Sequence, residues 1–300
     1  MSRPAFPDPS VHGGDGLRLA VEMGMDPSSI LDLSASLCPV APDPAPVIAA
    51  HLDALGRYPD PGWAAAVLAE AMGVERRHLL LTNGGAEAIA LVGSLLGGSV
   101  REPDFSLYPR AGGPRWRSNP NNPLGDLAAA DERAAVWDEA FWPLATGTWT
   151  RGDHAAGAVI VGSLTKLLAC PGLRIGYILC ADDDLMDDIR RAQPGWSVNG
   201  LAAEALPDLL APVDLPAWAT ETADLRARLV RLLGEHGLSV RIAGRGPWVL
   251  VDQAGDLRSR LLRVGVIVRD CASFGLAGTV RIAVPREKQF PQLETALRGP

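Results

Sequence analysis

The strongest constraint on the fold is a short apolar run that leads directly into a glycine turn and a helical pattern. Residues 79–82 (LLLT) have the composition of a buried strand, and Asn83, Gly84 and Gly85 follow them as a turn. Apolar side chains then recur with helical spacing over residues 86–96. Because a strand, a tight turn and a helix in this order make up the βα unit, the sequence predicts an α/β fold.

Further strand and helix patterns predict a larger domain followed by a smaller one. Before residue 208 the expected strands are near-continuous apolar runs, which are typical of a mostly parallel sheet with helices on both faces. After it, shorter strands such as residues 248–252 alternate with helices. We therefore expect an N-terminal arm over residues 1–45, a large domain over residues 46–207 and a small C-terminal α/β domain over residues 208–300. Four prolines in residues 39–46 (PVAPDPAP) indicate an extended, non-helical segment there.

Composition and charge exclude several classes of protein. Hydrophobic residues make up 47% of the chain and charged residues 21%, which is typical of a folded enzyme and not of a disordered chain. The formal net charge of −7 argues against a nucleic-acid-binding surface. The longest uncharged run, residues 88–100, is too short to span a bilayer, and residues 1–10 lack the apolar stretch of a secretory signal. We therefore expect a cytoplasmic protein without a nucleic-acid or membrane partner.

The cysteines and histidines do not have the spacing of a metal site. Cys38, Cys170, Cys180 and Cys271 are scattered without a CxxC pair, and the five histidines show no ligand spacing. We expect the cysteines to be buried thiols and expect no bound metal.

A lysine flanked by hydroxyls and an arginine carries the clearest chemical signal. Within residues 162–177 (GSLTKLLACPGLRIGY), Ser163 and Thr165 precede Lys166, and Arg174 follows the lysine. A lysine amine condenses with an aldehyde, while hydroxyls and a guanidinium bind a phosphate dianion. The segment therefore indicates a site for a phosphorylated carbonyl cofactor; the plain alternative is a surface lysine at the end of a strand.

Three more segments fit such a site, although each also has a plain structural explanation. Residues 83–87 (NGGAE) open a helix, whose first N–H groups and dipole attract a phosphate. Residues 119–125 (NPNNPLG) offer side-chain amides to a ligand. Asp138, in the segment DEAF, follows an apolar strand, where a buried acid keeps a pyridinium nitrogen protonated. The alternatives are ordinary turns for the first two segments and a helix-capping role for Asp138.

In the order NGG, NNPLG, DEAF, SLTK and GLRIGY, these motifs resemble those of fold-type I pyridoxal-phosphate enzymes of the class I/II aminotransferase superfamily. Within it, the chain is similar to the threonine-phosphate decarboxylases of cobalamin biosynthesis, which are related to the histidinol-phosphate aminotransferases. This resemblance extends from residue 12 to about residue 284 and rests on residues 12–16 (HGGDG), 31–36 (LDLSAS), 57–60 (RYPD), 193–199 (QPGWSVN) and 268–271 (VRDC). It implies the fold-type I transferase architecture, pyridoxal 5′-phosphate as cofactor and a homodimer, with the arm contributing to the small domain and the substrate site.

The resemblance also implies a role for each matched residue. Lys166 would be the Schiff-base lysine, Asp138 would pair with the pyridine nitrogen, and Asn122 would contact the ring hydroxyl. Phe105 is the preferred residue to stack on the ring, with Tyr108 as the alternative. The remaining cofactor contacts would be Gly84, Gly85, Ala86, Ser163, Thr165 and Arg174 around the phosphate, Phe141, and Tyr58, which would reach the cofactor phosphate of the partner subunit.

For the substrate, the resemblance implies two anion-binding groups. Arg281 matches the arginine that binds a carboxylate, whose two oxygens its planar fork recognises with parallel hydrogen bonds. His12, Gly13 and Arg269 match the ligands of a substrate phosphate. Cys38 stands where the family has an asparagine that helps to bind the substrate, and a thiol is a weaker hydrogen-bonding group than an amide.

The chain is also shorter than the family pattern near residues 106–118. Only 13 residues separate Phe105 from Asn119, where relatives carry a helix and strands of the large domain. Residues 112–118 (GGPRWRS) resemble the remainder of that unit. We expect its loss to uncover apolar sheet surface that includes Trp116 and that a dimer partner covers.

These features lead to three hypotheses about function. The first is decarboxylation of L-threonine O-3-phosphate, or of a similar phosphorylated amino acid, to an aminopropanol phosphate. The second is an aminotransferase of the histidinol-phosphate aminotransferase type, in which the same lysine moves a proton from Cα. The third is a degenerate homologue without catalysis. The bond held perpendicular to the cofactor ring decides between the first two, and the presence of Lys166, Asp138, Asn122, Arg174 and Arg281 argues against the third.

Overall fold

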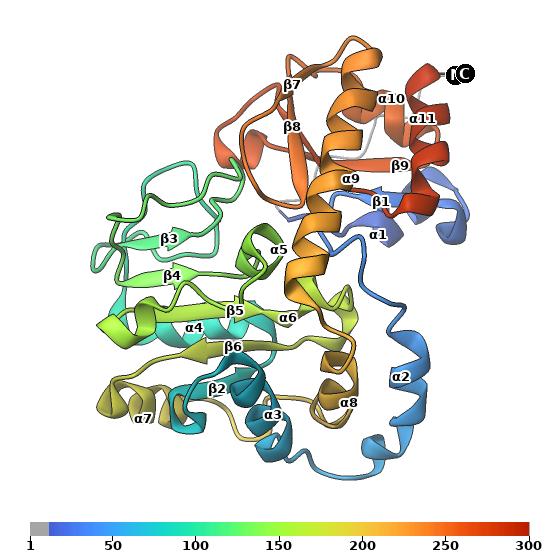
Figure 1. The fold of residues 1–300 in the computed structure, drawn as a ribbon. Coiled ribbons are helices and arrows are strands. Elements are labelled where there is room, and N and C mark those ends of the chain that lie inside the picture. The colour runs from blue at the N-terminus through green and yellow to red at the C-terminus, as the bar shows by residue number, and fades with distance from the viewer. Residues whose placement is uncertain (1–11, 300) are drawn as a thin grey trace.

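The computed structural model describes residues 12–299, which form two five-stranded sheets surrounded by helices (Figure 1). The strands of the large sheet, in spatial order, are β2 (Leu79–Thr82), β6 (Gly176–Leu179), β5 (Val159–Ser163), β4 (Val136–Asp138) and β3 (Trp116–Ser118). β6 runs antiparallel to both of its neighbours, whereas β3, β4 and β5 are parallel to one another. All strands of this sheet except β6 therefore share one direction, which confirms the mostly parallel sheet.

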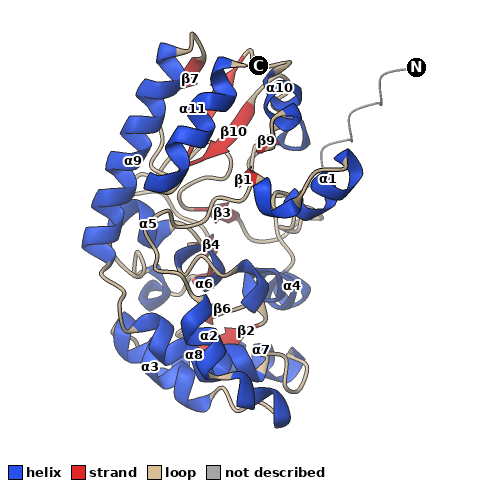
Figure 2. Ribbon diagram, turned by 90° about the vertical axis from the view of Figure 1, so that its right-hand side faces the viewer, coloured by secondary structure: helices blue, strands red, loops and turns tan. Residues whose placement is uncertain are grey.

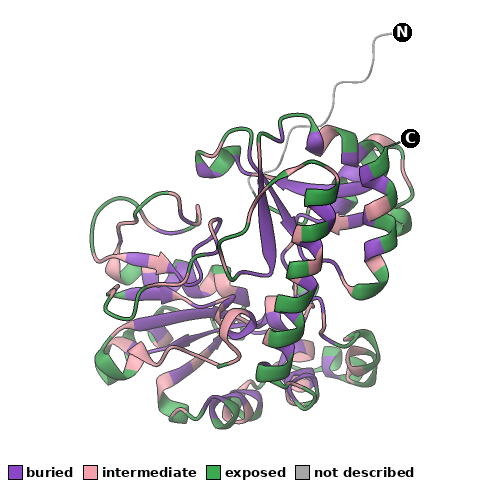
Figure 3. Cartoon of the chain, turned by 45° about the horizontal axis from the view of Figure 1, so that its top comes forward, coloured by how far each residue is buried: buried purple, intermediate pink, exposed green. Residues whose placement is uncertain are grey.

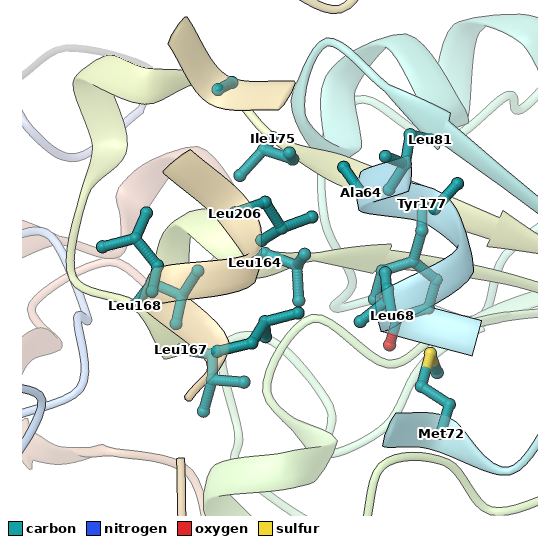
Figure 4. Close-up of a cluster of buried hydrophobic side chains, with 14 of the residues drawn as sticks. Ala64, Leu68, Met72, Leu81, Leu164, Leu167, Leu168, Ile175, Tyr177 and Leu206 are labelled. Carbon is teal, nitrogen blue, oxygen red and sulfur yellow. The ribbon is translucent and has the colours of Figure 1, made fainter. Parts of the chain in front are cut away.

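Helices cover both faces of the large sheet because its strands are apolar on both sides. Val159 and Val161 belong to the core on one face and Ile160 to the core on the other, since alternate residues of a strand point to opposite faces. The first core includes α4 (Gly84–Leu96) and α7 (Asp183–Ala192); the second, part of which Figure 4 shows, includes α3 (Gly62–Met72), α6 (Leu164–Leu167) and α8 (Gly200–Leu210).

The second sheet combines the N-terminal arm with the C-terminal part of the chain. Its strands, in spatial order, are β1 (Leu31–Leu33), β9 (Val266–Asp270), β10 (Val280–Ala283), β8 (Trp248–Asp252) and β7 (Ser239–Arg241). β1 is parallel to β9, and the other pairs are antiparallel. The helices that share a core with these strands are α9 (Leu215–Glu235), α10 (Leu257–Arg263) and α11 (Phe290–Arg298) (Figure 2). Because β1 is part of the arm, the arm completes this sheet.

Residues 12–50 include two α-helices that the sequence patterns did not predict, one within the arm and one that begins at its last residue. They are α1 (Gly16–Met23) and α2 (Ala45–Ala50). The expectation of a non-helical segment over residues 39–46 is wrong at its end, because Pro46 lies in the first turn of α2. Proline is tolerated there since the first N–H groups of a helix have no partner within the helix.

The predicted domain boundary at residue 208 lies within α8. Leucines of this helix and the first turn of α9 belong to the core of the large sheet. α9 then continues to the second sheet and packs on the way against α5 (Trp142–Thr146). The division into domains at residue 208 stays a prediction.

The chain itself covers the outer edge of the large sheet at β3. Trp116 is fully buried, its indole Nε1–H donates a hydrogen bond to the Gly97 carbonyl oxygen at 2.9 Å, and its ring packs against Tyr108. Gly98 is required beside the indole, because a Cβ at this position would lie 2.3 Å from Trp116 Nε1. Bridges between residues 98–99 and residues 112–115 hold this loop against the strand. The expectation of an uncovered apolar surface at Trp116 is therefore wrong.

Burial is concentrated in the strands of both sheets, which are largely purple in Figure 3. All four cysteines are free and buried, which confirms the expectation of buried thiols. Within residues 12–299, no helix is both long enough and apolar enough to span a bilayer.

Candidate active site

A cavity of about 200 Å³ is lined by the N-terminal arm, by the ends of the large-sheet strands and by the C-terminal sheet. It collects most of the residues that the sequence predicted for the site. Those that line it are His12, Gly13, Gly85, Ala86, Phe105, Asn122, Asp138, Phe141, Ser163, Thr165, Lys166, Arg174, Arg269 and Arg281. Four predicted residues, Gly84, Tyr108, Tyr58 and Cys38, lie outside the lining.

Lys166 enters the cavity from α6, the single helical turn that follows β5. The Cys38 N–H donates to the Lys166 carbonyl oxygen at 2.9 Å and ties this turn to the arm. Burial, and to a smaller extent the positive charges of Arg281 and Arg174, lower the pKa of the Lys166 amine to about 8. The cavity therefore raises the share of the neutral amine, which is the form that condenses with an aldehyde.

An anion cradle forms where α4 begins beside the end of β5. Gly84 has a φ of +75°, and a Cβ there would lie 2.5 Å from Nη2 of Arg174, so glycine lets the guanidinium approach the helix terminus. Gly85 stands against Ser163, whose Oγ lies 2.6 Å from Oγ1 of Thr165. The first N–H groups of a helix, two hydroxyls and one guanidinium are together suited to a phosphate.

Asp138 ends β4 and is held in place by two hydrogen bonds. Its Oδ2 accepts from the Tyr108 hydroxyl at 2.7 Å, and its Oδ1 accepts from the Ala140 N–H at 2.8 Å. Burial raises the pKa of the Asp138 carboxyl, while the bond from Tyr108 and the nearby Lys166 act in the opposite sense. A cationic ring nitrogen in the cavity would stabilise the carboxylate further.

Phe105 and Tyr108 have different places in the structure. The Phe105 ring lines the cavity, whereas Tyr108 is buried behind Asp138, between the rings of Phe105 and Trp116. Of the two aromatic residues that the sequence offered for stacking, only Phe105 is therefore available to a ring in the cavity. Phe141 lines the cavity from another side and packs edge-on against Trp248.

Arg281 and Arg269 bring two guanidinium groups to the opposite side of the cavity. The Arg281 Nη1 donates to Asn122 Oδ1 at 2.5 Å, and its Nη2 donates to the Ser34 carbonyl oxygen at 3.4 Å. The guanidinium also lies over the ring of Trp248. Its buried Nε has no hydrogen-bond partner within residues 12–299. Burial lowers the pKa of Arg281 to about 10, so the group stays charged at neutral pH.

The arm adds His12 and Gly13 beside Arg269. A Cβ on Gly13 would lie 2.3 Å from the Ser34 carbonyl oxygen, so only glycine fits there. The ring centroid of His12 lies 5.8 Å from that of Phe105, and burial followed by the charge of Arg269 lowers the pKa of the imidazole. A neutral imidazole next to a guanidinium can donate a hydrogen bond to an anion between them.

Two predicted residues lie apart from the cavity. Cys38 is 1% exposed in the core of the large sheet, and burial raises the pKa of its thiol to about 11. Only its backbone contributes to the site, through Lys166. Tyr58 is 78% exposed and packs against Trp196 on the surface, at a centroid distance of 4.8 Å.

Sequence reasoning assigned no role to several residues that line the cavity. Ser34, Ala35 and Ser36 follow β1 and reach the cavity because β1 joins the C-terminal sheet. The segment LDLSAS was part of the family resemblance, and that was the available signal for them. Apolar lining residues without any such signal are Ile89, Leu107, Val161 and Phe274.

A family model described as aminotransferase class I and II matches residues 117–297. The chain belongs to this family. Pyridoxal 5′-phosphate is therefore its cofactor, and the chain is a class I/II enzyme that depends on it.

Among curated members, threonine-phosphate decarboxylase of Salmonella typhimurium is 31% identical, and the match covers 97% of this chain and 96% of that protein. Histidinol-phosphate aminotransferase 1 of Dechloromonas aromatica is 27% identical, covering 93% of this chain and 92% of the relative. The alignment with the Salmonella protein extends over 354 positions, more than the 300 residues of this chain, so stretches of that relative have no counterpart here.

Solved structures show the same fold. Histidinol-phosphate aminotransferase from Sinorhizobium meliloti, in complex with pyridoxal 5′-phosphate, superposes with a TM-score of 0.79 at 18% identity and covers 99% of this chain and 94% of its own. L-threonine-O-3-phosphate decarboxylase from Porphyromonas gingivalis gives a TM-score of 0.73 at 24% identity, with 90% of this chain and 98% of that chain covered. These neighbours confirm the fold-type I architecture, even though this chain is shorter.

Proposed function

We propose that this enzyme decarboxylates L-threonine O-3-phosphate, or a similar small phosphorylated amino acid, to an aminopropanol phosphate and carbon dioxide. The observation that carries the proposal is that Arg269 and Arg281 line the same cavity as Lys166. Two separate guanidinium groups suit a substrate with two anionic groups, a carboxylate and a phosphate. The 31% identity with a threonine-phosphate decarboxylase supports the same choice.

The residues of the cavity fit pyridoxal 5′-phosphate. The Lys166 amine would hold the aldehyde carbon, Asp138 the ring nitrogen and Asn122 the ring hydroxyl. The phosphate would be held by the start of the helix at Gly84, Gly85 and Ala86, together with Ser163, Thr165 and Arg174. A Cβ at Gly84 would collide with the Arg174 guanidinium, so glycine is needed for this arrangement. Phe105 and Phe141 would contact the ring. When bound, the cofactor supplies an electron sink for the pair of electrons left on Cα.

The arginines would orient the substrate. Arg281, fixed by Asn122 and Ser34, has a donor left at Nε for the carboxylate. Arg269, His12 and Gly13 would hold the phosphate. With both ends of the substrate fixed, these residues would select the bond from Cα to the carboxylate as the one that is broken. The Lys166 amine would return a proton to Cα.

We further propose that two copies of the chain form a homodimer with shared active sites. Exposed apolar side chains of the segment around η2 (Leu52–Gly56) support a contact surface, since Leu55 is 70% and Tyr58 78% exposed. Tyr58 would reach the cofactor phosphate of the partner subunit. We also propose that the enzyme acts in the cytoplasm and that its product is a building block of cobalamin.

The second candidate function is an aminotransferase of the histidinol-phosphate aminotransferase type. Relatives of this name at 27% and 28% identity favour it. In this case the Cα–H bond would stand perpendicular to the ring, and Lys166 would act as the general base. A degenerate, non-catalytic role is disfavoured, because Lys166, Asp138, Asn122, Arg174 and Arg281 all line one cavity.

Product analysis tests the proposal. Purified enzyme with pyridoxal 5′-phosphate and L-threonine O-3-phosphate should release carbon dioxide in equal amount to an aminopropanol phosphate. Transfer of the amino group to 2-oxoglutarate, without carbon dioxide, would contradict the decarboxylase and favour the aminotransferase. Lys166→Ala, which removes the amine, should abolish either reaction.

A further inference from the structure

A buried carboxyl at the shortened edge of the large sheet contacts two segments of the active site. Asp104, which is 3% exposed, follows residues 98–103 at the outer edge of β3. Its Oδ1 accepts hydrogen bonds from the Ser118 hydroxyl at 2.5 Å and from the Phe105 N–H at 2.8 Å. Its Oδ2 accepts from the Ser118 N–H at 3.3 Å. The carboxyl thus joins the loop that carries Phe105 to the end of β3.

This carboxyl accepts a hydrogen bond from a backbone N–H at the outer edge of β3, where no neighbouring strand pairs with it. The N–H of Asn119 faces β4 and donates to the Asp138 carbonyl oxygen, whereas the N–H groups of Trp116 and Ser118 face outward. Trp116 donates to the Ser99 carbonyl oxygen, and Ser118 donates to Asp104. A buried N–H without an acceptor is costly, so these contacts replace a strand at this edge.

From Ser118 the hydrogen bonds continue across the site. The Asn122 N–H donates to the Ser118 hydroxyl oxygen at 2.7 Å, and Asn122 Oδ1 accepts from Arg281 Nη1 at 2.5 Å. A continuous line of four residues therefore runs from Asp104 through Ser118 and Asn122 to Arg281. Its far end is a guanidinium of the cavity wall, and Phe105, at its near end, lines the same cavity.

We propose that Asp104 is a positioning residue of the active site, which holds Asn122 against Arg281 through Ser118 and fixes Phe105 at the cavity wall. Asp104 touches neither substrate nor cofactor, and it acts on both through these neighbours. The proposal rests on the proposed function in one respect, namely that Arg281 binds the carboxylate of the substrate. Removal of the carboxyl frees the Ser118 hydroxyl to turn away from Asn122, so Arg281 loses its fixed direction.

The test compares Asp104→Ala, Asp104→Asn and Ser118→Ala with the wild-type holoenzyme, by KM and kcat for L-threonine O-3-phosphate and by thermal midpoint. We expect Asp104→Ala and Ser118→Ala each to raise KM roughly tenfold, the equivalent of one lost buried hydrogen bond. Asp104→Asn keeps an acceptor oxygen for the Ser118 hydroxyl and should restore most of the affinity, but its NH2 replaces the acceptor of the Ser118 N–H, so the thermal midpoint should stay below that of the wild type. In the double variant of Asp104→Ala with Ser118→Ala, KM should rise no further than in either single variant, because both break the same line.

Glu139→Gln is the matched control. Like Asp104, Glu139 is a buried carboxyl outside the cavity lining, but it accepts from the Arg151 N–H, whereas Asp104 accepts from Ser118 and Phe105. This variant should lower the thermal midpoint without raising KM. The proposal is overturned if Asp104→Ala lowers only the thermal midpoint, or if Glu139→Gln raises KM as much.

Failure of the proposed function is recognised separately, by wild-type enzyme that does not turn over this substrate. In that case a crystal structure of Asp104→Ala decides about positioning. Loss of the contact between Arg281 and Asn122 supports the proposal, and retention of that contact, with Phe105 in place, refutes it. If Asp104→Ala does not fold, the structure and KM of Ser118→Ala give the same answer.

Discussion

Arg269 and Arg281 stand directly opposite each other on the neighbouring strands β9 and β10, and both side chains line the cavity that contains Lys166. Directly opposed residues of an antiparallel pair project from the same face of the sheet, so two like charges there repel each other. Burial, and with it the charge of Arg269, lowers the pKa of Arg281. An anionic substrate relieves both effects, which is the physical reason to expect a substrate with a carboxylate and a phosphate.

Arg281 should bind the carboxylate of the substrate, and Arg269 should bind its phosphate. Arg281→Ala should weaken binding of L-threonine O-3-phosphate by roughly 10- to 100-fold, as expected for a lost bond between charged groups, but leave binding of aminopropanol phosphate, which has no carboxylate, nearly unchanged. Arg269→Ala should weaken both ligands. Dissociation constants from spectral titration of the holoenzyme measure this. Arg228→Ala, which removes an arginine paired with Glu287 away from the cavity, is the control. Equal losses for both ligands in Arg281→Ala would disprove this assignment.

The two lysines of the sequence provide an internal comparison for the reactivity of Lys166. Burial lowers the pKa of Lys166 to about 8, so its neutral share should increase about tenfold between pH 7 and pH 9. Brief exposure to pyridoxal 5′-phosphate, followed by borohydride, should label Lys166 with this pH dependence, and the exposed Lys288 far less. Mass spectrometry of the peptides measures the labelling. Preferential labelling of Lys288, or labelling of Lys166 that does not rise with pH, would contradict the role of burial.

Cys38 should affect stability and not substrate affinity. Its thiol packs in the core of the large sheet, and only its backbone N–H contacts Lys166. Cys38→Ala should therefore lower the free energy of unfolding by about 1 kcal/mol and leave KM unchanged. Cys38→Asn places an amide in the apolar core and should cost more, about 1–3 kcal/mol. Chemical denaturation and steady-state kinetics check both. An increase in affinity for Cys38→Asn would show instead that this position contacts the substrate.

Gly98 should be indispensable to the shortened edge of the sheet. A Cβ at Gly98 would lie 2.3 Å from Trp116 Nε1, so Gly98→Ala should displace the indole and cost about 1–3 kcal/mol or more of stability. At Gly255 a Cβ meets nothing within 4 Å, and Gly255→Ala should be tolerated. Thermal unfolding of both variants measures the difference. If Gly98→Ala were as stable as Gly255→Ala, the loop would not depend on this close approach.

Local sequence patterns predicted the elements whose burial is visible in a short stretch of chain. The apolar run at β8 was predicted with the bounds that the structure shows, Trp248–Asp252. β1 was missed because it has only three residues and becomes a strand by pairing with β9, far along the chain. The length of α6, one turn, is likewise below what helical periodicity can indicate.

In the site too, local sequence patterns predicted residues that lie close together in the chain and missed contacts between distant segments. Ser163, Lys166 and Arg174 lie within one motif, and the structure brings all of them to the cavity. The bond between Arg281 and Asn122 joins residues 159 positions apart, and no local pattern contains it. The covering of Trp116 by its own loop also depends on close packing of glycines, which composition does not reveal.

The most direct test of the cofactor site is the visible absorbance of the purified protein with pyridoxal 5′-phosphate, before and after L-threonine O-3-phosphate is added. We expect a band of lysine-bound cofactor that is absent in Lys166→Ala and that shifts when the phosphorylated amino acid is added. A protein that forms no band, or that forms the same band without Lys166, would show that this cavity is not a pyridoxal-phosphate site built on Lys166. A band that forms but ignores L-threonine O-3-phosphate would contradict the assignment of the substrate.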